Sequence, residues 1–382
     1  MYRPLRGLRH SGQCRQDPGQ EPGEHAPPVR CGRAQAAGQL SFAGGTDSYP
    51  GFCETLPGIP ASVGPGQRRA GQRRVTPEQL RQLRASLPSF AEPAPNTALL
   101  TDYLQFYHLD FSANYPDARH DCGTVPSAGE RLFVHRWLQP GARANLLLVH
   151  GYFDHSGIYD KLVEYGLSRG CNVLIFDLPG HGLSSGERAS VDDFADYGRA
   201  VHDVMRSVPM PALPFFALGQ STGCAALMEL ARHHPWPFAR VALLAPLVRP
   251  AGWRGVQLGH SLLRRFTDSL ERKFKRNTSD SGFLDFLRND PLQSQRMSLP
   301  WIGALRRWLK SLPIADLGVG PALVVQGRRD ATVGWRYNMK AILRLFPGSE
   351  IHFLPEAGHQ LANESAAIRA DYAAALDRYY FS

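Results

Sequence analysis

The stretch over residues 215–227 constrains the fold of this chain more than any other segment. It consists of a short apolar strand, the sequence Gly-Gln-Ser-Thr-Gly, and the start of an apolar helix. A serine at such a strand-to-helix turn adopts a strained backbone that lifts its hydroxyl clear of the sheet. Gly219 and Gly223 stand where a Cβ would collide with the strand or the helix. The pattern predicts a nucleophile at Ser221; the alternative is an ordinary serine in a tight turn.

A serine nucleophile requires a base, and the base requires a group that orients it. Asp330 and His359 each follow an apolar strand, at the end where parallel sheets keep their sites. Taken singly, they read as a loop-capping aspartate and a surface histidine, but after Ser221 they stand in the order that this topology requires. We therefore predict a triad of Ser221, His359 and Asp330. Glu356 is the alternative acid, although it is close in sequence to His359.

A third part of the predicted site is an oxyanion hole made of backbone N–H groups. An apolar strand over 145–150 runs into Gly151 and Tyr152. In this architecture the loop after that strand donates one N–H, and the residue after the nucleophile donates the other. The amides of Tyr152 and Thr222 are therefore the expected donors. We expect His150 to brace the loop and to take no part in the chemistry.

Apolar runs along the chain alternate with helical patterns. Strands are predicted at 104–111, 131–138, 145–150, 172–177, 214–219, 240–245, 322–327 and 350–354, and helices at 158–169, 190–206, 222–233 and 364–380. This alternation indicates an α/β protein with a mainly parallel sheet that helices cover on both faces. The first two strands are expected to be antiparallel. The sequence contains neither a phosphate-binding loop nor a dinucleotide fingerprint.

Several segments together resemble a known family. They are His150-Gly151, 154–159, 176–188, the turn at Ser221, 245–248, 327–330 and 357–359. The chain resembles the monoacylglycerol lipase and lysophospholipase branch of the α/β-hydrolases, which is also grouped with serine aminopeptidases. The resemblance implies an α/β-hydrolase fold with an eight-stranded sheet, a helical cap and hydrolysis of esters. The family usually has His before the nucleophile and Met-Gly-Gly after it, whereas this chain has Gln220 and Thr-Gly-Cys.

Composition divides the chain into four parts. Residues 1–74 hold 13 Gly, 9 Pro, 10 Arg and no Lys, without a sustained apolar period, so we expect a disordered extension or a translation start that lies further downstream. Thr76 as N-cap and Pro77 as first helical residue mark a natural beginning. The hydrolase core is expected over 75–250 and 313–382, with a cap over 251–312 between them.

The predicted cap is long and basic. A simple crossover between parallel strands needs about a dozen residues, whereas about 75 separate the strands at 240–245 and 322–327. Residues 251–312 carry 12 basic and 5 acidic side chains of a chain whose net charge is +9. One helical face there holds Trp301, Ile302, Leu305, Trp308, Leu309 and Leu312, while Arg306, Arg307 and Lys310 lie elsewhere. Two readings follow: a lid with solvated arginines, or a lid that touches anionic lipid.

The sequence thus predicts a serine hydrolase for a lipid-like ester, such as a monoacylglycerol or a lysophospholipid. It needs neither a metal nor an organic cofactor, and no motif accompanies the basic charge to suggest nucleic acid. The spacing of Cys122, Cys171 and Cys224 is not that of a metal site. Together with the lack of a secretory signal, these cysteines favour a cytoplasmic location, with or without peripheral membrane contact. One alternative is a peptidase whose Asp154 or Glu187 holds the substrate's ammonium group. Another is a non-catalytic binding protein.

Overall fold

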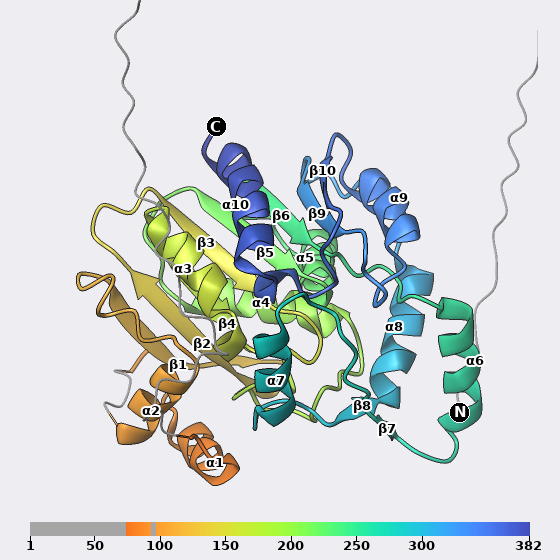
Figure 1. Cartoon of the computed structure of the whole chain (residues 1–382), viewed down its shortest axis with the longest axis horizontal. Helices are drawn as coiled ribbons and strands as arrows, with labels where there is room; N and C mark the ends of the chain where they lie inside the picture. Colours follow the sequence, from red (N-terminus) through yellow and green to blue (C-terminus); the bar gives the residue numbers. More distant parts are fainter. Residues whose placement is uncertain (1–73, 93–96) are drawn as a thin grey trace, which may run out of the picture. The chain divides into compact units, whose positions relative to one another are not determined.

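The computed structural model describes residues 74–92 and 97–382, and eight strands among them form one sheet (Figure 1). The expected extension lies outside the described residues, except for Arg74. In chain order the strands are β1 (Arg119–Ser127), β2 (Glu130–Leu138), β3 (Ala144–Val149), β4 (Cys171–Phe176), β5 (Phe215–Gln220), β6 (Arg240–Leu244), β9 (Leu323–Gly327) and β10 (Glu350–Leu354). Across the sheet the order is β1-β2-β4-β3-β5-β6-β9-β10. Only β1 pairs with β2, and β2 with β4, in the antiparallel sense.

Helices precede, connect and follow the strands of the sheet. They are α1 (Pro77–Ser86), α2 (Ala98–Phe106), α3 (Asp160–Ser168), α4 (Ala195–Ser207), α5 (Thr222–His233), α6 (Trp253–Leu263), α7 (Ser281–Asn289), α8 (Leu299–Ser311), α9 (Trp335–Leu345) and α10 (Ala366–Phe381). Two short 3-10 helices, Ser156–Ile158 and Leu361–Asn363, precede α3 and α10. Thr76 caps α1 in a capping box with Gln79, and Pro77 is its first residue, as the sequence predicts.

The core lies on both faces of the sheet. Leu146 and Leu148 of β3 pack with α3 and α10 on one face, and Leu147 and Val149 pack with α4, α5 and α9 on the other. This division follows from the alternation of side chains along a strand. The predicted α/β fold, with a mainly parallel eight-stranded sheet covered on both sides, is confirmed.

The strand predicted at 104–111 is wrong. That segment holds the end of α2 and the turns that follow, and the edge strand is β1 instead. Thr97 caps α2, and Tyr103 and Tyr107 are spaced for one buried helical face, which explains the apolar pattern. β1 escaped prediction because its sequence is largely polar. Its pairing with β2 is set by the turn at Ala128 and Gly129, both with positive φ, a geometry that suits a two-residue hairpin.

The segment over 251–312, called the insertion below, lies between β6 and β9. It contains α6, α7, α8 and a small antiparallel pair, β7 (Ser269–Glu271) and β8 (Arg296–Ser298). The apolar face of α8 is buried against α4 and α5, as its sequence indicates. By contrast, α6 leaves Leu258 and Leu262 63% and 61% exposed, and Phe266 just beyond it is 84% exposed. Among the helices described here, none is long and apolar enough to cross a membrane.

Candidate active site

The turn between β5 and α5 holds Ser221 in a strained backbone. Its φ of 52° and ψ of −110° lie where residues with a side chain are rarely found. A Cβ on Gly223 would approach the Val149 carbonyl oxygen to 2.1 Å, and one on Gly219 would come within 2.9 Å of the Cys224 nitrogen. Both positions therefore require glycine, as the sequence predicts, because the start of α5 packs closely against the end of β3 at Gly223 and against β5 at Gly219.

Ser221, His359 and Asp330 lie in a hydrogen-bonded row. His359 Nε2 is 3.0 Å from Ser221 Oγ, and His359 Nδ1 is 2.8 Å from Asp330 Oδ2. All three residues are buried, with exposures of 6–8%. The serine belongs to the turn after β5, while the acid and the histidine follow β9 and β10. The carboxyl ends of these strands meet at one edge of the sheet, so residues far apart in sequence converge there.

The surroundings of Asp330 fix its carboxylate and charge. Its Oδ1 accepts hydrogen bonds from the backbone N–H groups of Thr332 and Val333, at 2.8 and 3.1 Å, and Oδ2 accepts one from Gln326 Nε2. Burial raises the pKa of Asp330, but the charge of His359 and these hydrogen bonds outweigh burial and lower it overall. Burial in turn lowers the pKa of His359, and the charge of Asp330 outweighs this and raises it.

Glu356, the alternative acid, lies elsewhere. It forms an ion pair with Arg329, and both side chains are about two-thirds exposed, at 66% and 65%. His359 Nδ1 instead bonds to Asp330. Of the two acids considered from the sequence, the structure brings only Asp330 next to the histidine.

The loop after β3 reaches the nucleophile through Gly151. A Cβ placed on Gly151 would lie 3.3 Å from Ser221 Cβ, so the next backbone N–H, that of Tyr152, belongs to a segment in contact with the turn. Thr222 opens α5, where the first N–H groups of a helix have no intrahelical acceptor. His150 braces the loop as expected: its Nε2 accepts a hydrogen bond from Leu178 N at 2.9 Å, and Nδ1 donates to Gly151 O.

A polar network that the sequence did not predict joins this loop to the loop of His359. Gly151 N donates to Tyr159 Oη at 3.1 Å, and Tyr159 Oη donates to Asp154 Oδ2 at 3.0 Å. Asp154 Oδ1 accepts from Gln360 Nε2 at 2.8 Å. Burial raises the pKa of Asp154, which is 7% exposed. The only signal in the sequence was the spacing of Asp154 and Tyr159 within one motif.

Gln220, the departure from the family pattern, makes a second link between the same regions. Its side chain is fully buried; Nε2 donates to His359 O at 2.8 Å, and Oε1 accepts from Ala362 N at 3.3 Å. The residue before the nucleophile thus holds the backbone of the residue that would accept the proton. An amide suits this position because it can donate and accept at once.

A second buried histidine–carboxylate pair lies outside the predicted triad. His155 Nε2 is 2.7 Å from Asp290 Oδ2, and both side chains are fully buried. Asp290 also accepts from Tyr107 Oη at 2.7 Å. The pair joins the loop after β3 to the segment that follows α7 of the insertion. Burial lowers the pKa of His155, but the charge of Asp290 outweighs this and raises it.

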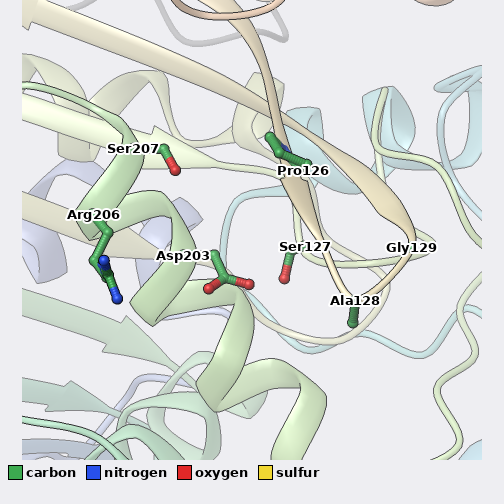
Figure 2. Close-up of a pocket in the computed structure, with 7 residues that line it drawn as sticks. All are labelled: Pro126, Ser127, Ala128, Gly129, Asp203, Arg206 and Ser207. Carbon is green, nitrogen blue, oxygen red and sulfur yellow. The ribbon is translucent and has the colours of Figure 1, made fainter.

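The two acids considered for holding an ammonium group lie in different surroundings. Both oxygens of Asp154 already accept hydrogen bonds from protein groups, and Glu187 is exposed. A surface cavity of about 440 Å³ lies elsewhere, between the β1–β2 turn and the end of α4 (Figure 2). It is lined by Ser127, Asp203 and Arg206, among others, and by none of the predicted site residues.

The sheet order, with a serine at the sharp turn after β5, defines the chain as an α/β-hydrolase. Residues 140–366 match the family model described as serine aminopeptidase, S33, and the chain belongs to this family of hydrolases. It is 30% identical to mouse monoglyceride lipase over 241 residues, which are 56% of this chain and 74% of that protein.

A second relative and a solved structure are also similar to this chain. Human monoglyceride lipase is 37% identical over 145 residues, 36% of this chain, and this match spans 45% of the human protein, less than half of its length. The crystal structure of a soluble variant of monoglyceride lipase from Saccharomyces cerevisiae, in complex with a substrate analogue, aligns with a TM-score of 0.58 at 20% identity. The alignment covers 68% of this chain and 94% of that one. At that identity the solved structure supports the fold alone.

Proposed function

We propose that this protein hydrolyses carboxylic esters by way of an acyl-enzyme on Ser221. The observation that carries the proposal is the row from Ser221 Oγ through His359 to Asp330, with distances of 3.0 and 2.8 Å. A serine hydroxyl is a weak nucleophile until a base takes its proton, and a histidine held by a carboxylate is such a base. The strained turn and the buried carboxylate orient these groups before substrate arrives.

The reaction has two halves. In the first, His359 Nε2 takes the proton of Ser221 as Oγ attacks the ester carbonyl, and then gives that proton to the leaving alcohol. In the second, His359 activates a water molecule that attacks the acyl-enzyme, and the acid departs as Ser221 regains its proton. Asp330 holds the Nδ1–H tautomer and stabilises the imidazolium. The backbone N–H groups of Tyr152 and Thr222 would stabilise the oxyanion in both halves.

A lipid-like ester, such as a monoacylglycerol or a lysophospholipid, is the substrate class we propose. Relatives named monoglyceride lipase support it. So does the apolar surface of α6, where Leu258, Leu262 and Phe266 are more than half exposed, beside the exposed Arg264 and Arg265. We propose that the insertion acts as a cap that contacts an anionic lipid surface, in a cytoplasmic protein with peripheral membrane contact. The net charge of the insertion, +7 from 12 basic and 5 acidic side chains, favours such contact.

A fluorophosphonate probe tests the chemistry first. Wild-type protein should be labelled at Ser221, the variant Ser221→Ala should not, and Ser261→Ala, which alters an exposed serine of α6, should be labelled as the wild type is. A panel of p-nitrophenyl esters of rising acyl length then separates a short-ester esterase from a lipase, and aminoacyl amides test the peptidase alternative. Absence of labelling in folded wild-type protein would favour a non-catalytic binding protein.

Co-sedimentation with anionic vesicles tests the cap. Replacing Leu262 and Phe266 by Ser, or Arg264 and Arg265 by Glu, should weaken binding, and added salt should weaken the wild-type interaction, because each basic residue near the surface is worth about 1 kcal/mol and is screened. Leu343→Ser is the matched control, since Leu343 is an exposed leucine of α9 outside the insertion. Turnover of a short soluble ester should not change. Equal sedimentation of all variants would refute the lipid contact.

A further inference from the structure

Three side chains that commonly bind metal ions meet on the β1–β2 hairpin. His120 and Cys122 are two residues apart on β1, so they share a face, and His135 of β2 is the direct register partner of Cys122. His120 Nε2 and His135 Nδ1 are 2.9 Å apart, and one ligand atom from each of the three residues falls within 4.8 Å of the others. The hairpin is at the edge of the sheet, and strands β4 and β3 lie between it and β5.

Packing holds this group rigidly. His135 and Cys122 are 0% and 2% exposed, whereas His120 is only partly buried. The ring of His120 stacks on Trp137 at 4.7 Å, and the ring of His135 stacks on Tyr103 of α2 at 5.8 Å with planes 12° apart. Rings fixed by such neighbours lose little further freedom when they bind a ligand, so the group is preorganised.

The protonation states are those that a metal ion needs from imidazoles. Burial lowers the pKa of His120 to about 4 and that of His135 well below its usual value, so both rings are neutral near pH 7. Burial raises the pKa of the Cys122 thiol to about 12. The thiol must therefore lose its proton as the metal binds, which is the usual behaviour of cysteine ligands.

One polar atom in the group has no partner among the described residues. His135 Nε2 is buried without a hydrogen bond, and the other nitrogen of that ring shares one hydrogen bond with His120. This nitrogen is one of eight buried side-chain nitrogen and oxygen atoms without a hydrogen bond among the described residues, so it is the convergence of the three side chains, and not this atom, that indicates a site. Hairpin packing alone explains the ring stack but not two histidines and a thiol that turn their polar atoms toward one another.

We propose that His120, Cys122 and His135 form a binding site for one Zn²⁺ ion, with water as the fourth ligand on the partly exposed side of His120. Imidazole and thiolate are preferred ligands of Zn²⁺, which binds them at about 2.0–2.1 and 2.3 Å, so tetrahedral neighbours lie about 3.3–3.6 Å apart. The two imidazole nitrogens, now 2.9 Å apart, would have to separate to this spacing when the ion enters. Binding releases the Cys122 proton to solvent, and any imidazole proton facing the ion moves to that ring's other nitrogen. The ion would fasten the edge strand β1 to β2.

Metal titration of the tag-free full-length chain, first treated with chelator and reductant, tests this site. In competition with a chromophoric chelator, the wild type should bind one equivalent of Zn²⁺. Cys122→Ala should lower the affinity for this equivalent by about 100-fold or more, since even the loss of a residue that only supports a ligand lowers metal affinity by about 10–100-fold. Co²⁺ in place of Zn²⁺ should give a thiolate-to-metal charge-transfer band that Cys122→Ala removes. Cys171→Ala is the matched control, because Cys171 is an equally buried thiol of β4 outside the group.

Folding and activity are measured on the same samples. Fluorophosphonate labelling of Ser221 and near-ultraviolet circular dichroism report whether each variant is folded, and Zn²⁺ should raise the melting temperature of the wild type and of Cys171→Ala only. If Cys122→Ala does not fold, His120→Gln decides, since His120 is only partly buried and its loss should weaken the same equivalent. The proposed site would be overturned if folded Cys122→Ala or folded His120→Gln bound Zn²⁺ as tightly as the wild type does. It would also be overturned if the folded wild type did not bind Zn²⁺.

Discussion

Within residues 74–92 and 97–382, two histidine–carboxylate pairs are buried on both sides, and one of the two faces a serine. His359 and Asp330 are joined at 2.8 Å, His155 and Asp290 at 2.7 Å, and in each pair the neighbouring charge raises the pKa of the histidine and lowers that of the aspartate. The pairs differ at the second ring nitrogen. His359 Nε2 lies 3.0 Å from Ser221 Oγ, whereas His155 Nδ1 accepts a hydrogen bond from Gly157 N of its own loop at 3.2 Å.

The difference lies in what stands beside each histidine, because a histidine held by a carboxylate can act as a base toward a serine only where the hydroxyl is within reach of its second ring nitrogen. In the first pair the second ring nitrogen of the histidine lies beside a hydroxyl on a strained turn, so this nitrogen can accept the proton of that hydroxyl. In the second pair every polar atom is already engaged with the protein: Asp290 also binds Tyr107 Oη and Leu292 N. We therefore interpret the second pair as a junction that fastens the insertion to the core.

The largest effect expected in this comparison belongs to the nucleophile. Ser221→Ala should lower ester turnover by about 10⁶-fold, because loss of the nucleophile alone costs as much as loss of a whole triad. The fold should persist, since alanine fits a site built for a small side chain. Steady-state kinetics on a soluble ester and circular dichroism check this, and turnover within tenfold of wild type would disprove the assignment.

Exchanging the acids should separate the two pairs. Asp330→Asn should lower turnover by about 10⁴-fold, as the loss of the correct histidine tautomer does in other triads. His359→Ala should lower turnover by about 10⁶-fold, as Ser221→Ala does, and neither His359→Ala nor Asp330→Asn should add to Ser221→Ala, because the three act as a unit. The same kinetic assay applied to Glu356→Gln should give nearly wild-type turnover. A silent Asp330→Asn with a damaging Glu356→Gln would mean that the acid is misassigned.

Asp290→Asn should affect stability and spare chemistry. Removing one partner of a buried ion pair costs about 3–5 kcal/mol, because the other is left uncompensated. Urea unfolding should show this loss, while the turnover of the remaining folded protein stays within tenfold of wild type. Asp203→Asn, at a more exposed aspartate of α4, is the control and should unfold as the wild type does. A loss of turnover matching that of Asp330→Asn would show that the junction reaches the chemistry.

The smallest effects are in the pH dependence. Turnover requires neutral His359, whose pKa is raised above 6.5, so activity should rise with pH through a midpoint above 6.5, and Asp330→Asn should move that midpoint down. The pKa of His155 is also raised above 6.5. His155 therefore stabilises the fold when it is protonated, and this contribution is lost as the pH rises through its pKa in the folded state. The ionised Asp290 contributes its full stabilisation of the fold above pH 3.8, and this stabilisation is lost as the pH falls through the lowered pKa of Asp290 in the folded state.

Urea titrations at several pH values check the second half of that statement. The destabilisation by Asp290→Asn should be greatest between about pH 4 and 6.5 and should shrink at higher pH, where His155 is neutral. The two pairs would then have opposite preferences, one most useful when its histidine is charged and the other when it is neutral. A destabilisation that does not vary over this range would show that hydrogen bonding alone joins His155 to Asp290.

Sequence predicted those parts of the molecule that depend on local order. The strand, turn and helix around Ser221 lie within one short segment, and Asp330 and His359 each follow a recognisable strand, so topology brings them together. The bond between His155 and Asp290 joins residues 135 positions apart, and although His155 lies in the family-like segment 154–159, nothing in the sequence marks Asp290 as its partner. β1 was missed because an edge strand needs little apolar surface. The role of Gln220 depends on a loop that meets it only after folding.

The backbone of Ser221 has a consequence for how this protein would drift if its activity were no longer selected. A residue with a Cβ at φ 52° and ψ −110° costs the fold on the order of 1–3 kcal/mol. Alanine keeps that cost, but glycine removes it, so Ser221→Gly should melt at a higher temperature than Ser221→Ala. Mutational drift would then favour glycine at the very position where chemistry needs a hydroxyl. Serine at this position thus costs the fold stability that a glycine would return, and the comparison of Ser221→Gly with Ser221→Ala measures that cost.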